Sequence, residues 1–397
     1  MLGKMQSHIH TENYESYKRR DKMTDRKEIL KDVRKIVVKI GTSSLTTKDG
    51  RFKKEFARDI AMQVSKLKSE GKDVILVSSG AIGTGCEALD FKERPKSIPL
   101  KQATAAVGQS ILMDEWRQAF AEFNLKVAQI LLTYDAFSDR KTYLNLRNSM
   151  SVLLELGVIP IINENDPICV HEIGETFGDN DTLSAMMSSK VEADLLILMT
   201  DIDGLYNKNP KKAKDAKKIP IIEEITPKIE SFGGSAGERG TGGMKTKLEA
   251  AKIAHKSGCY MVIASSQEKN LISRIMSGED IGTLFLPSKN IEKNKIRWIT
   301  LAKPKGKIII DLGAKNALLD HKSLLPRGIV DVEGDFDAGD IVALEADNEV
   351  FAKGITNYTK KELEKIKGKN TDEIESILGY KNYNEIIKSE NIGIIKE

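Results

Sequence analysis

Short apolar runs and longer segments with a helical period alternate along most of the chain. The short runs are rich in β-branched residues, which favour strands, and the longer segments repeat their apolar positions with the period of an amphipathic helix. Strands are predicted at 35–40, 73–79, 125–132, 158–163, 194–199 and 260–264, and helices at 53–70, 99–123, 142–156, 182–192 and 244–257. We therefore predict an α/β fold, an open and mostly parallel sheet sandwiched by helices.

Glycines mark the ends of several of these predicted helices. Gly71, Gly157 and Gly258 each follow a helical segment and precede a predicted strand. Glycine is the usual residue just past a helix C-terminus, because it tolerates a left-handed backbone. We predict that these three residues end their helices.

The pattern changes after about residue 289. Short strands are predicted at 296–302, 306–311, 328–333, 341–345 and 350–355, followed by helices at 359–367 and 371–378. Such a series indicates a smaller, mainly β second domain. The predicted organisation is a polar, flexible N-terminal extension (1–32), an α/β catalytic domain (33–290), a linker (291–303), a mainly β domain (304–381) and a C-terminal tail packing on it (382–397).

Composition narrows the class of protein. The 397 residues include 62 Lys and Arg against 58 Asp and Glu, and a net charge of +4 is too balanced to indicate nucleic-acid binding. Cys86, Cys169 and Cys259 are scattered, which predicts neither a disulfide framework nor a Cys-rich zinc site. No apolar run approaches the roughly 20 residues of a membrane span. A cytoplasmic protein without a membrane partner is expected.

Candidate chemistry gathers where the predicted strands end. Lys39 stands near the end of the first strand, and Gly41 opens a hydroxyl-rich turn after it. Ligands of open α/β sheets bind at this edge, and free N–H groups in glycine-containing turns attract anions. Ser78-Ser79-Gly80 forms a second such turn, whereas the G-x-G-x-x-A match at 83–88 lies too far beyond its strand for a dinucleotide-binding turn. We interpret both turns as walls of a phosphate site, the alternative being that Lys39 is a solvated charge.

Acidic and amide side chains crowd the end of the fourth predicted strand. Asn163-Glu164-Asn165-Asp166 close this strand, and Gly178-Asp179-Asn180-Asp181 follow after a polar loop. Helix capping explains one of them, with Asp181 as the N-cap residue. It does not explain the cluster directly after a core strand, which is costly unless it binds something.

Two further segments complete the candidate site. Thr200 and Asp201 follow the strand at 194–199, and residues 240–247 read Gly-Thr-Gly-Gly-Met-Lys-Thr-Lys before a predicted helix. A helix N-terminus suits phosphate because its free N–H groups and dipole favour negative charge. Lysines in that first turn oppose the dipole, and a bound anion would explain them. The P-loop pattern G-x-x-x-x-G-K-[ST] does not occur in the chain.

Lysines, N–H-rich turns and carboxylates together favour phosphoryl transfer from a nucleotide, which depends on positioning and charge neutralisation. None of the five histidines lies in these turns, which argues against a histidine base. A carboxylate acceptor is already ionised at pH 7 and needs no base. The residues favour a kinase that forms an acyl phosphate. The alternative is a kinase with another acceptor, in which an Asp acts as the general base.

These motifs occur in the order and spacing of a known family. They are VVKIGTS at 37–43, SSGAI at 78–82, INEND at 162–166, GDND at 178–181, TDIDGLY at 200–206 and GTGGMKTK at 240–247. With them the chain resembles the amino acid kinase family, and within it the members that act on L-glutamate. Residues 324–329 (LLPRGI) and 334–340 (GDFDAGD) resemble a PUA domain.

The resemblance implies ATP-dependent, in-line phosphorylation of the L-glutamate γ-carboxylate without a general base, the first step of proline biosynthesis. It implies that Lys39 and Lys247 neutralise the transferring phosphoryl group and that Asp181 holds both lysines. The implied glutamate-binding residues are Ser79, Asp166 and Asn180, with Asp166 meeting the α-ammonium. The implied nucleotide-binding residues are Lys39, Thr200, Asp201, Thr241, Gly242, Gly243, Met244, Lys245, Thr246 and Lys247.

The resemblance also implies partners. Mg²⁺ would be bound mainly through the ATP phosphates, without dedicated metal-ligating residues. A homo-oligomer, dimer or tetramer, with proline as feedback inhibitor is expected. Two features depart from the family pattern: Lys245 replaces a small hydroxyl residue, which puts nucleotide affinity in doubt, and the N-terminal extension has no counterpart.

Two alternatives stay open. One is another amino acid kinase that acts on a different small acid. The other is an RNA-binding protein led by the PUA domain, which is not favoured because no basic patch interleaved with aromatic residues stands out.

Overall fold

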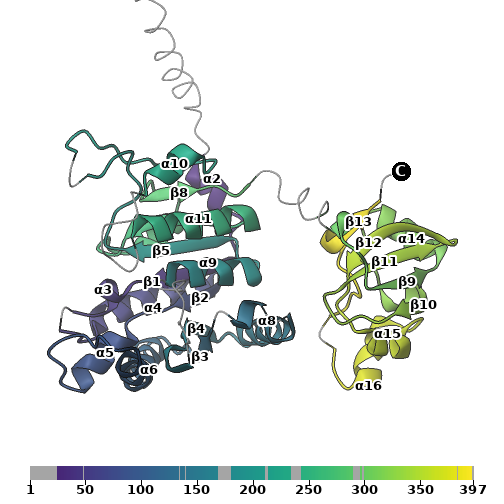
Figure 1. The fold of residues 1–397 in the computed structure, drawn as a ribbon, viewed down its shortest axis with the longest axis horizontal. Coiled ribbons are helices and arrows are strands. Elements are labelled where there is room, and N and C mark those ends of the chain that lie inside the picture. The colour runs from purple at the N-terminus through teal and green to yellow at the C-terminus, as the bar shows by residue number, and fades with distance from the viewer. Residues whose placement is uncertain are drawn as a thin grey trace, which may run out of the picture. The chain divides into compact units, whose positions relative to one another are not determined.

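The computed structural model describes residues 25–47, 49–133, 135–138, 140–168, 180–210, 213–233, 243–288, 296, 299–381 and 383–395, without the side chains of residues 135, 138, 140, 141 and 144. The chain divides into two compact units, Met1–Ser288 and Lys289–Glu397 (Figure 1). Each unit has its own sheet and its own core. No helix in the described ranges is long and apolar enough to cross a membrane.

An eight-stranded sheet organises the first unit. Its strands, in spatial order, are β3 (Val127–Leu132), β4 (Ile159–Glu164), β2 (Asp73–Val77), β1 (Lys35–Ile40), β5 (Leu195–Thr200), β7 (Tyr260–Ser265), β8 (Thr283–Phe285) and β6 (Ile221–Ile222). The β7–β8 pair is antiparallel, and every other neighbouring pair is parallel. The predicted fold class is confirmed, since helices cover both faces.

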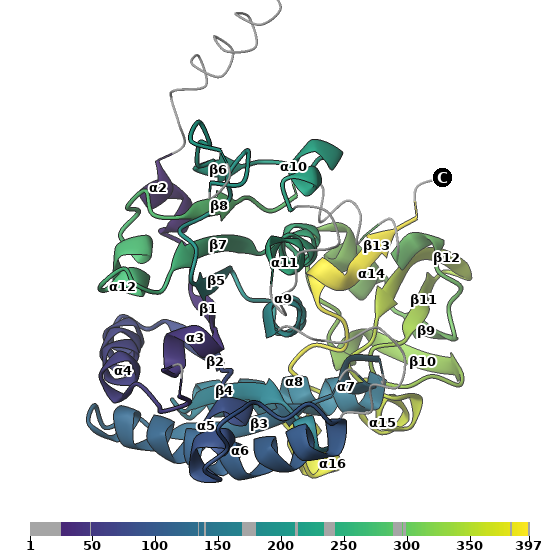
Figure 2. The ribbon, with the colours of Figure 1, turned by 60° about the vertical axis from the view of Figure 1, so that its left-hand side comes forward.

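The apolar strands bury alternate residues in two separate cores. On β1, Val38 packs in one core and Val37 in the other, because successive side chains of a strand point to opposite faces. The helices of this unit are α2 (Arg26–Leu30), α3 (Thr42–Leu45), α4 (Lys54–Ser69), α5 (Ala81–Ala88), α6 (Ile98–Ala121), α7 (Asp135–Ser138), α8 (Arg140–Glu155), α9 (Asn180–Lys190), α10 (Pro227–Ser231), α11 (Met244–Ser257) and α12 (Leu271–Met276), with a 3-10 turn, η1 (Asp166–Ile168). Figure 2 shows α4 and α12 on one side of the sheet and α9 and α11 on the other.

The predicted helix stops are confirmed. Gly71, Gly157 and Gly258 have φ of 76°, 71° and 90°, the left-handed region that glycine tolerates. The glycines of 83–88 have a different function, because this segment lies in α5. A Cβ on Gly85 would lie 1.9 Å from the carbonyl oxygen of Thr104, and one on Gly108 would lie 1.9 Å from that of Ala81. The glycines therefore let α5 and α6 meet backbone to backbone.

The predicted N-terminal extension is too long. Residues 26–30 form α2, in which Leu30 is 1% exposed and belongs to the core. The buried Arg26 guanidinium donates to the carbonyl oxygens of Ile281 and Pro220, both at 2.7 Å. This part of the extension is thus anchored at the edge of the sheet, and residues 1–24 lie outside the described residues.

The second unit is built on a five-stranded sheet. Its strands, in spatial order, are β10 (Ile329–Gly334), β9 (Gly306–Ile310), β11 (Ile341–Ala346), β12 (Glu349–Ile355) and β13 (Ile392–Ile394), accompanied by α14 (Leu312–Leu319), η2 (Pro326–Gly328), α15 (Lys360–Ile366), η3 (Thr371–Glu373), α16 (Ile374–Leu378) and η4 (Ser389–Asn391). The predicted strand at 296–302 is wrong, because its described residues 296 and 299–301 are helical. An apolar run of this length fits either structure, and Ile299 is buried.

Candidate active site

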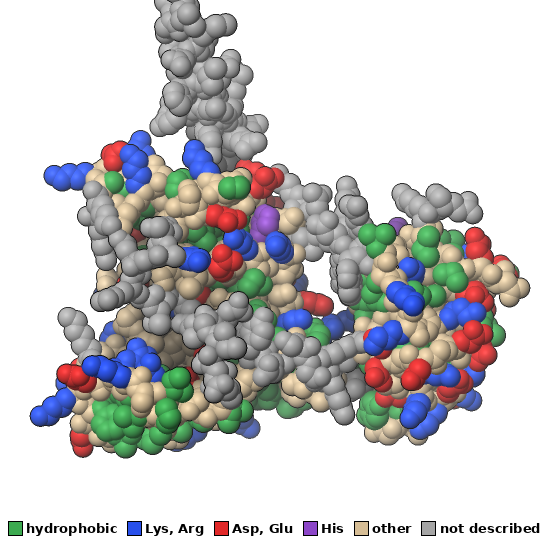
Figure 3. All heavy atoms as spheres, viewed as in Figure 1, with side chains coloured by type: hydrophobic (Ala, Val, Ile, Leu, Met, Phe, Trp, Pro, Cys, Tyr) green, Lys and Arg blue, Asp and Glu red, His purple; other side chains and the backbone are tan. Residues whose placement is uncertain are grey.

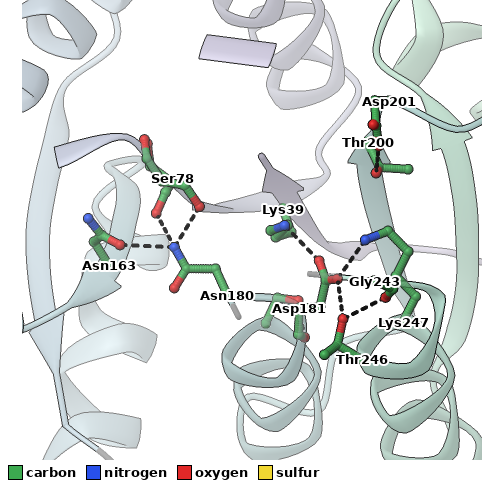
Figure 4. A network of polar contacts seen from close by, with 12 residues as sticks. Lys39, Ser78, Asn163, Asn180, Asp181, Thr200, Asp201, Gly243, Thr246 and Lys247 are labelled. Atoms are coloured by element: carbon green, nitrogen blue, oxygen red, sulfur yellow. Dashed lines mark hydrogen bonds and ion pairs between the residues drawn. The ribbon is translucent and has the colours of Figure 1, made fainter. Parts of the chain in front are cut away.

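Lys39, Asp181 and Lys247 meet at the carboxyl edge of the first unit's sheet (Figure 4). Lys39 Nζ lies 2.7 Å from Asp181 Oδ1, and Lys247 Nζ donates to Asp181 Oδ2 at 3.0 Å. Both lysines come from elements far apart in the chain, β1 and α11, and the carboxylate comes from α9 between them. One carboxylate therefore fixes two ammonium groups in the same place.

Local periodicity explains why these charged side chains are buried. Lys39 follows Val37 on the same face of β1, the face that α9 and α11 cover. Lys247 lies on the stripe of α11 that also buries Ala250, Ala251 and Ala254. Both lysines thus extend an apolar face to the edge of the sheet, where their ammonium groups meet the carboxylate.

The electrostatics of Asp181 follow from its two partners. The side chain is 0% exposed, and those of Lys39 and Lys247 are 7% and 4% exposed. Burial by itself would raise the pKa of Asp181, but attraction to Lys39 and Lys247 outweighs it and holds that pKa below its usual value. The capping alternative is wrong for Asp181. This residue lies inside the first turn of α9, and its two carboxylate oxygens contact the lysines.

Asn180 organises a second polar group beside the first. Its Nδ2 donates to Ser79 Oγ at 2.7 Å, to the Ser78 carbonyl oxygen at 2.8 Å and to Asn163 Oδ1 at 3.0 Å. Asn163 in turn donates through Nδ2 to Gln109 Oε1 at 2.8 Å. The turn after β2, the end of β4 and the start of α9 are thereby joined at one point.

The serine turn after β2 is held in place by a hydrogen bond from α6. Gly80 has φ of 108°, so the backbone turns sharply into α5. Trp116 is fully buried on α6, and its Nε1–H donates to Ser78 Oγ at 3.0 Å. Neither Gln109 nor Trp116 was predicted from the sequence, because their hydrogen-bond partners are distant in the chain. Asn163 belongs to the acidic and amide cluster at 163–166, for which the sequence predicted a binding site without assigning Asn163 a role.

The predicted nucleotide-binding residues lie on the other side of Lys39. Thr200 ends β5 with its side chain buried, and its Oγ1 donates to the exposed Asp201 at 3.0 Å. Thr246 Oγ1 donates to the Gly243 carbonyl oxygen at 2.8 Å and lies 3.3 Å from Asp181 Oδ2. Gly243 is the N-cap residue of α11, Met244 begins this helix, and Lys245 is exposed in its first turn. Thr241 and Gly242, like Gly178 and Asp179, lie outside the described residues.

Asp166 lies just beyond the end of β4, close to a cavity beside the Asn163–Asn180 group. It begins η1 beyond β4 and is half-buried. It lines a cavity of about 260 Å³ together with Gln109 and Glu164. Gln109 thus contacts this cavity and the Asn163–Asn180 group at once, which links Asp166 to the rest of the site.

Comparison with known proteins identifies the family. A model of the amino acid kinase family matches residues 34–265, and a model of the PUA domain matches residues 306–378. The chain belongs to the amino acid kinase family, and its second unit contains a PUA domain. Both predictions from the motifs are confirmed.

Full-length relatives place the chain within that family. A glutamate 5-kinase of Methanococcoides burtonii is 60% identical over 94% of this chain and 100% of its own length. A glutamate 5-kinase of Methanosarcina mazei is 57% identical over 94% of this chain and 100% of its own. A bacterial glutamate 5-kinase, from Caldanaerobacter subterraneus, is 49% identical over 91% of this chain and 98% of its own. Within the amino acid kinases, the chain falls among the glutamate 5-kinases.

Proposed function

We propose that this chain transfers the γ-phosphoryl group of ATP to the γ-carboxylate of L-glutamate, giving L-glutamyl 5-phosphate and ADP. The observation that carries the proposal is the shared carboxylate of Asp181, which fixes the Lys39 and Lys247 ammonium groups at the carboxyl edge of the sheet. Full-length similarity to proteins named glutamate 5-kinase supports the choice of substrate.

Charge is the main contribution of this site. In phosphoryl transfer, negative charge moves over the oxygens of the transferred group, and fixed cations stabilise it without reorganising. Lys39 and Lys247 are such cations, since both are buried and held within 3.0 Å of the same carboxylate. Asp181 is a positioning residue in this proposal, because it acts through the two lysines.

The step requires no proton transfer. An oxygen of the ionised γ-carboxylate attacks the γ-phosphorus, the bond from that phosphorus to the β,γ-bridging oxygen breaks in line, and ADP leaves with the electron pair. The acceptor is ionised at neutral pH, so no general base is needed. The two lysine side chains act by charge and take part in no bond that forms or breaks.

The Asn180 group suits the amino acid. Asn180 spends its Nδ2 on protein acceptors, which leaves its Oδ1 to accept from the α-ammonium of glutamate. Ser79 accepts from Asn180 and keeps its own proton to donate to a carboxylate. Asp166 offers the α-ammonium a second, charged acceptor. These residues would bind glutamate on the side of Lys39 away from Thr200.

The opposite side suits the nucleotide. Thr200, Asp201 and the first turn of α11 would hold ATP, with Lys39 and Lys247 between the nucleotide and the amino acid. Magnesium enters with the substrate as MgATP, bound through the phosphate oxygens. Among the described residues, no group of three or more His, Cys, Asp and Glu side chains is placed to hold a metal ion.

Pathway, regulation and assembly complete the proposal. The product would serve proline synthesis, and proline would inhibit its formation. Exposed apolar side chains near the α5–α6 connection support assembly with a second copy, since such patches mark protein contacts (Figure 3). These side chains are Leu89, Phe91, Ile98 and Leu100, which are 37% to 54% exposed. RNA binding by the PUA domain is not expected to be the main function of the chain.

A hydroxylamine trap tests the proposed reaction. With MgATP, hydroxylamine and L-glutamate, the purified chain should form glutamyl hydroxamate, because an acyl phosphate reacts with this nucleophile. L-Aspartate and N-acetyl-L-glutamate should give background levels. Hydroxamate from one of these acids instead of from glutamate would assign the chain another acceptor within the same family. Failure with every acid, in a chain that still binds nucleotide, would refute the proposed reaction.

A further inference from the structure

One hydroxyl contact spans the end of the strand that carries Thr200. Ser44, in α3 just beyond β1, donates through Oγ to Ser266 Oγ at 2.7 Å. Ser266 follows β7, and β5 lies between β1 and β7 in the sheet. The contact therefore joins the segments after two strands that are not neighbours, across the carboxyl end of the strand between them.

Ser266 is fixed relative to Thr200 by the backbone. Its N–H donates to the Thr200 carbonyl oxygen at 2.7 Å, which continues the pairing of Thr200 with Ser265 in the sheet. The turn after β7 is closed by the Gln267 N–H, which donates to Ser265 Oγ at 3.3 Å. The Ser266 hydroxyl thus has a defined place beside the end of β5.

The segment after β1 is held from two sides. On the side of α4, Lys53 Nζ donates to the Ser43 carbonyl oxygen at 2.7 Å, and the Lys53 N–H donates to that of Leu45 at 2.8 Å. On the side of β7, the side-chain contact is the one from Ser44 to Ser266. This segment directly follows Lys39, so its position sets where the nucleotide phosphates can lie relative to that lysine.

One of the two hydroxyl protons of Ser44 and Ser266 is not used in the contact between them. Two hydroxyl groups carry two protons, and the contact between them uses one. Ser44 is 4% exposed, whereas Ser266 is half-buried, and the second proton has no acceptor among the described residues. A hydroxyl so placed, next to Thr200, is able to donate to an oxygen of a bound nucleotide.

We infer that Ser266 is a positioning residue for the nucleotide. Its contact with Ser44 fixes the segment after Lys39 and so sets the position of the nucleotide relative to that lysine. The inference rests on the proposed use of ATP at this edge. It assigns a role in nucleotide binding to the turn after β7, and none of the predicted site residues lies in that turn. Removing either hydroxyl should loosen the nucleotide and leave the amino acid side of the site intact.

Binding and kinetics of two matched variants test this inference. Ser266→Ala and Ser44→Ala should each weaken binding of the magnesium complex of a non-hydrolysable ATP analogue by about 3- to 10-fold, the value of one neutral hydrogen bond. The KM for ATP should rise by the same factor while the KM for glutamate stays within twofold. The double variant should bind the analogue no more weakly than the single variant with the larger loss, because Ser44 acts only through its contact with Ser266.

Controls separate positioning from stability. Ser277→Ala removes an exposed hydroxyl that donates to the Arg274 carbonyl oxygen and should leave nucleotide binding unchanged. Ser266→Thr, which restores the hydroxyl, should recover most of the lost affinity. Analogue binding by Ser266→Ala equal to that of the unmodified chain, or additive losses in the double variant, would overturn the inference. Because analogue binding needs no turnover, these outcomes stay readable even if glutamate proves not to be the acceptor.

Discussion

Lys39 and Lys247 contact the two oxygens of a single carboxylate, at 2.7 Å and 3.0 Å, although one lysine lies on β1 and the other on α11. The proposed site depends on this relationship. Had the fold placed the two lysines at opposite edges of the sheet, they could not act on one phosphoryl group. Their common partner, Asp181, instead brings both to the edge where ligands of parallel sheets bind.

Lys247→Met should lower kcat by about 100-fold or more, the usual cost of removing a group that stabilises charge in the transition state. The KM for glutamate should change less than threefold, because the ammonium group acts mainly on the moving phosphoryl group. Steady-state kinetics with both substrates provide the measurement. Lys256→Met, at an exposed position of the same helix, should retain normal kcat. A normal kcat in Lys247→Met would exclude the lysine from catalysis.

Asp181→Asn should destabilise the first unit by about 3–5 kcal/mol at pH 7, because it leaves two buried ammonium groups without their counter-ion. Urea unfolding followed by circular dichroism provides the measurement. Asp32→Asn, at an exposed position, should have no effect. Equal stability of Asp181→Asn and the unmodified chain at pH 7 would contradict the proposed role of the carboxylate.

The same carboxylate should make stability depend on pH in the acid range. The lysines lower the pKa of Asp181 in the folded chain, so its stabilisation is complete above the unfolded value near 3.8. That stabilisation is lost as the pH falls below this value and through the lower, folded pKa, because the unfolded chain takes up the proton first. The difference in unfolding free energy between Asp181→Asn and the unmodified chain should therefore shrink below about pH 4. A difference that stays constant down to pH 2 would refute this.

Asn180→Asp should raise the KM for glutamate by about 10-fold or more. The new carboxylate has no N–H to donate to Ser79, Ser78 and Asn163, and it repels the carboxylates of the substrate. Initial rates at varied glutamate concentration provide the measurement. Asn207→Asp is the matched control, because its side chain accepts from the Lys217 N–H and an Asp does the same. An unchanged KM for glutamate would remove Asn180 from the amino acid site.

Gly108→Ala should destabilise the first unit by about 3 kcal/mol, at the upper end for overpacking. The added Cβ would lie 1.9 Å from the Ala81 carbonyl oxygen and 2.4 Å from the Gly85 nitrogen, both backbone atoms that cannot move aside. Thermal and urea unfolding provide the measurements. Ser110→Ala, at an exposed position of the same helix, should be neutral. An unfolding midpoint equal to that of this control would show that α5 and α6 can move apart without a loss of stability.

Removal of the PUA-containing unit, from Lys289 onward, should leave glutamyl hydroxamate formation largely intact. The proposed catalytic and binding residues all lie in the first unit, which has its own two cores. The isolated second unit should bind RNA weakly or not at all. Strong, salt-sensitive RNA binding by that unit would favour the alternative of an RNA-binding protein.

The sequence predicted the longer strands of the first unit's sheet, because both faces are covered and the strands are continuous apolar runs, whereas the short β6 and β8 were not predicted. It predicted α5 poorly, because Ala81–Ala88 contains two glycines that are typical of loops. Here the tight crossing with α6 requires Gly85 and Gly108, so tertiary packing overrides helix propensity.

Within the site, the sequence located the segments, and the family resemblance implied that Asp181 holds both lysines, but neither indicated the hydrogen bonds that support the site. Capping and ion pairing were both consistent with Asp181, and only its position inside the first turn of α9 separates them. The support from Trp116 and Gln109 depends on how α6 packs beneath β2 and β4. Such long-range hydrogen bonds leave no local pattern in a single sequence.

The crossing of α5 and α6 has a mechanical consequence. Where α5 and α6 touch through their main chains at Gly85 and Gly108, the two helices have little room to shift against each other. The Ser79 turn at the head of α5 therefore acts as a rigid wall. The proposed acyl phosphate is prone to hydrolysis, and a wall that does not move leaves its shielding from water to other parts of the site.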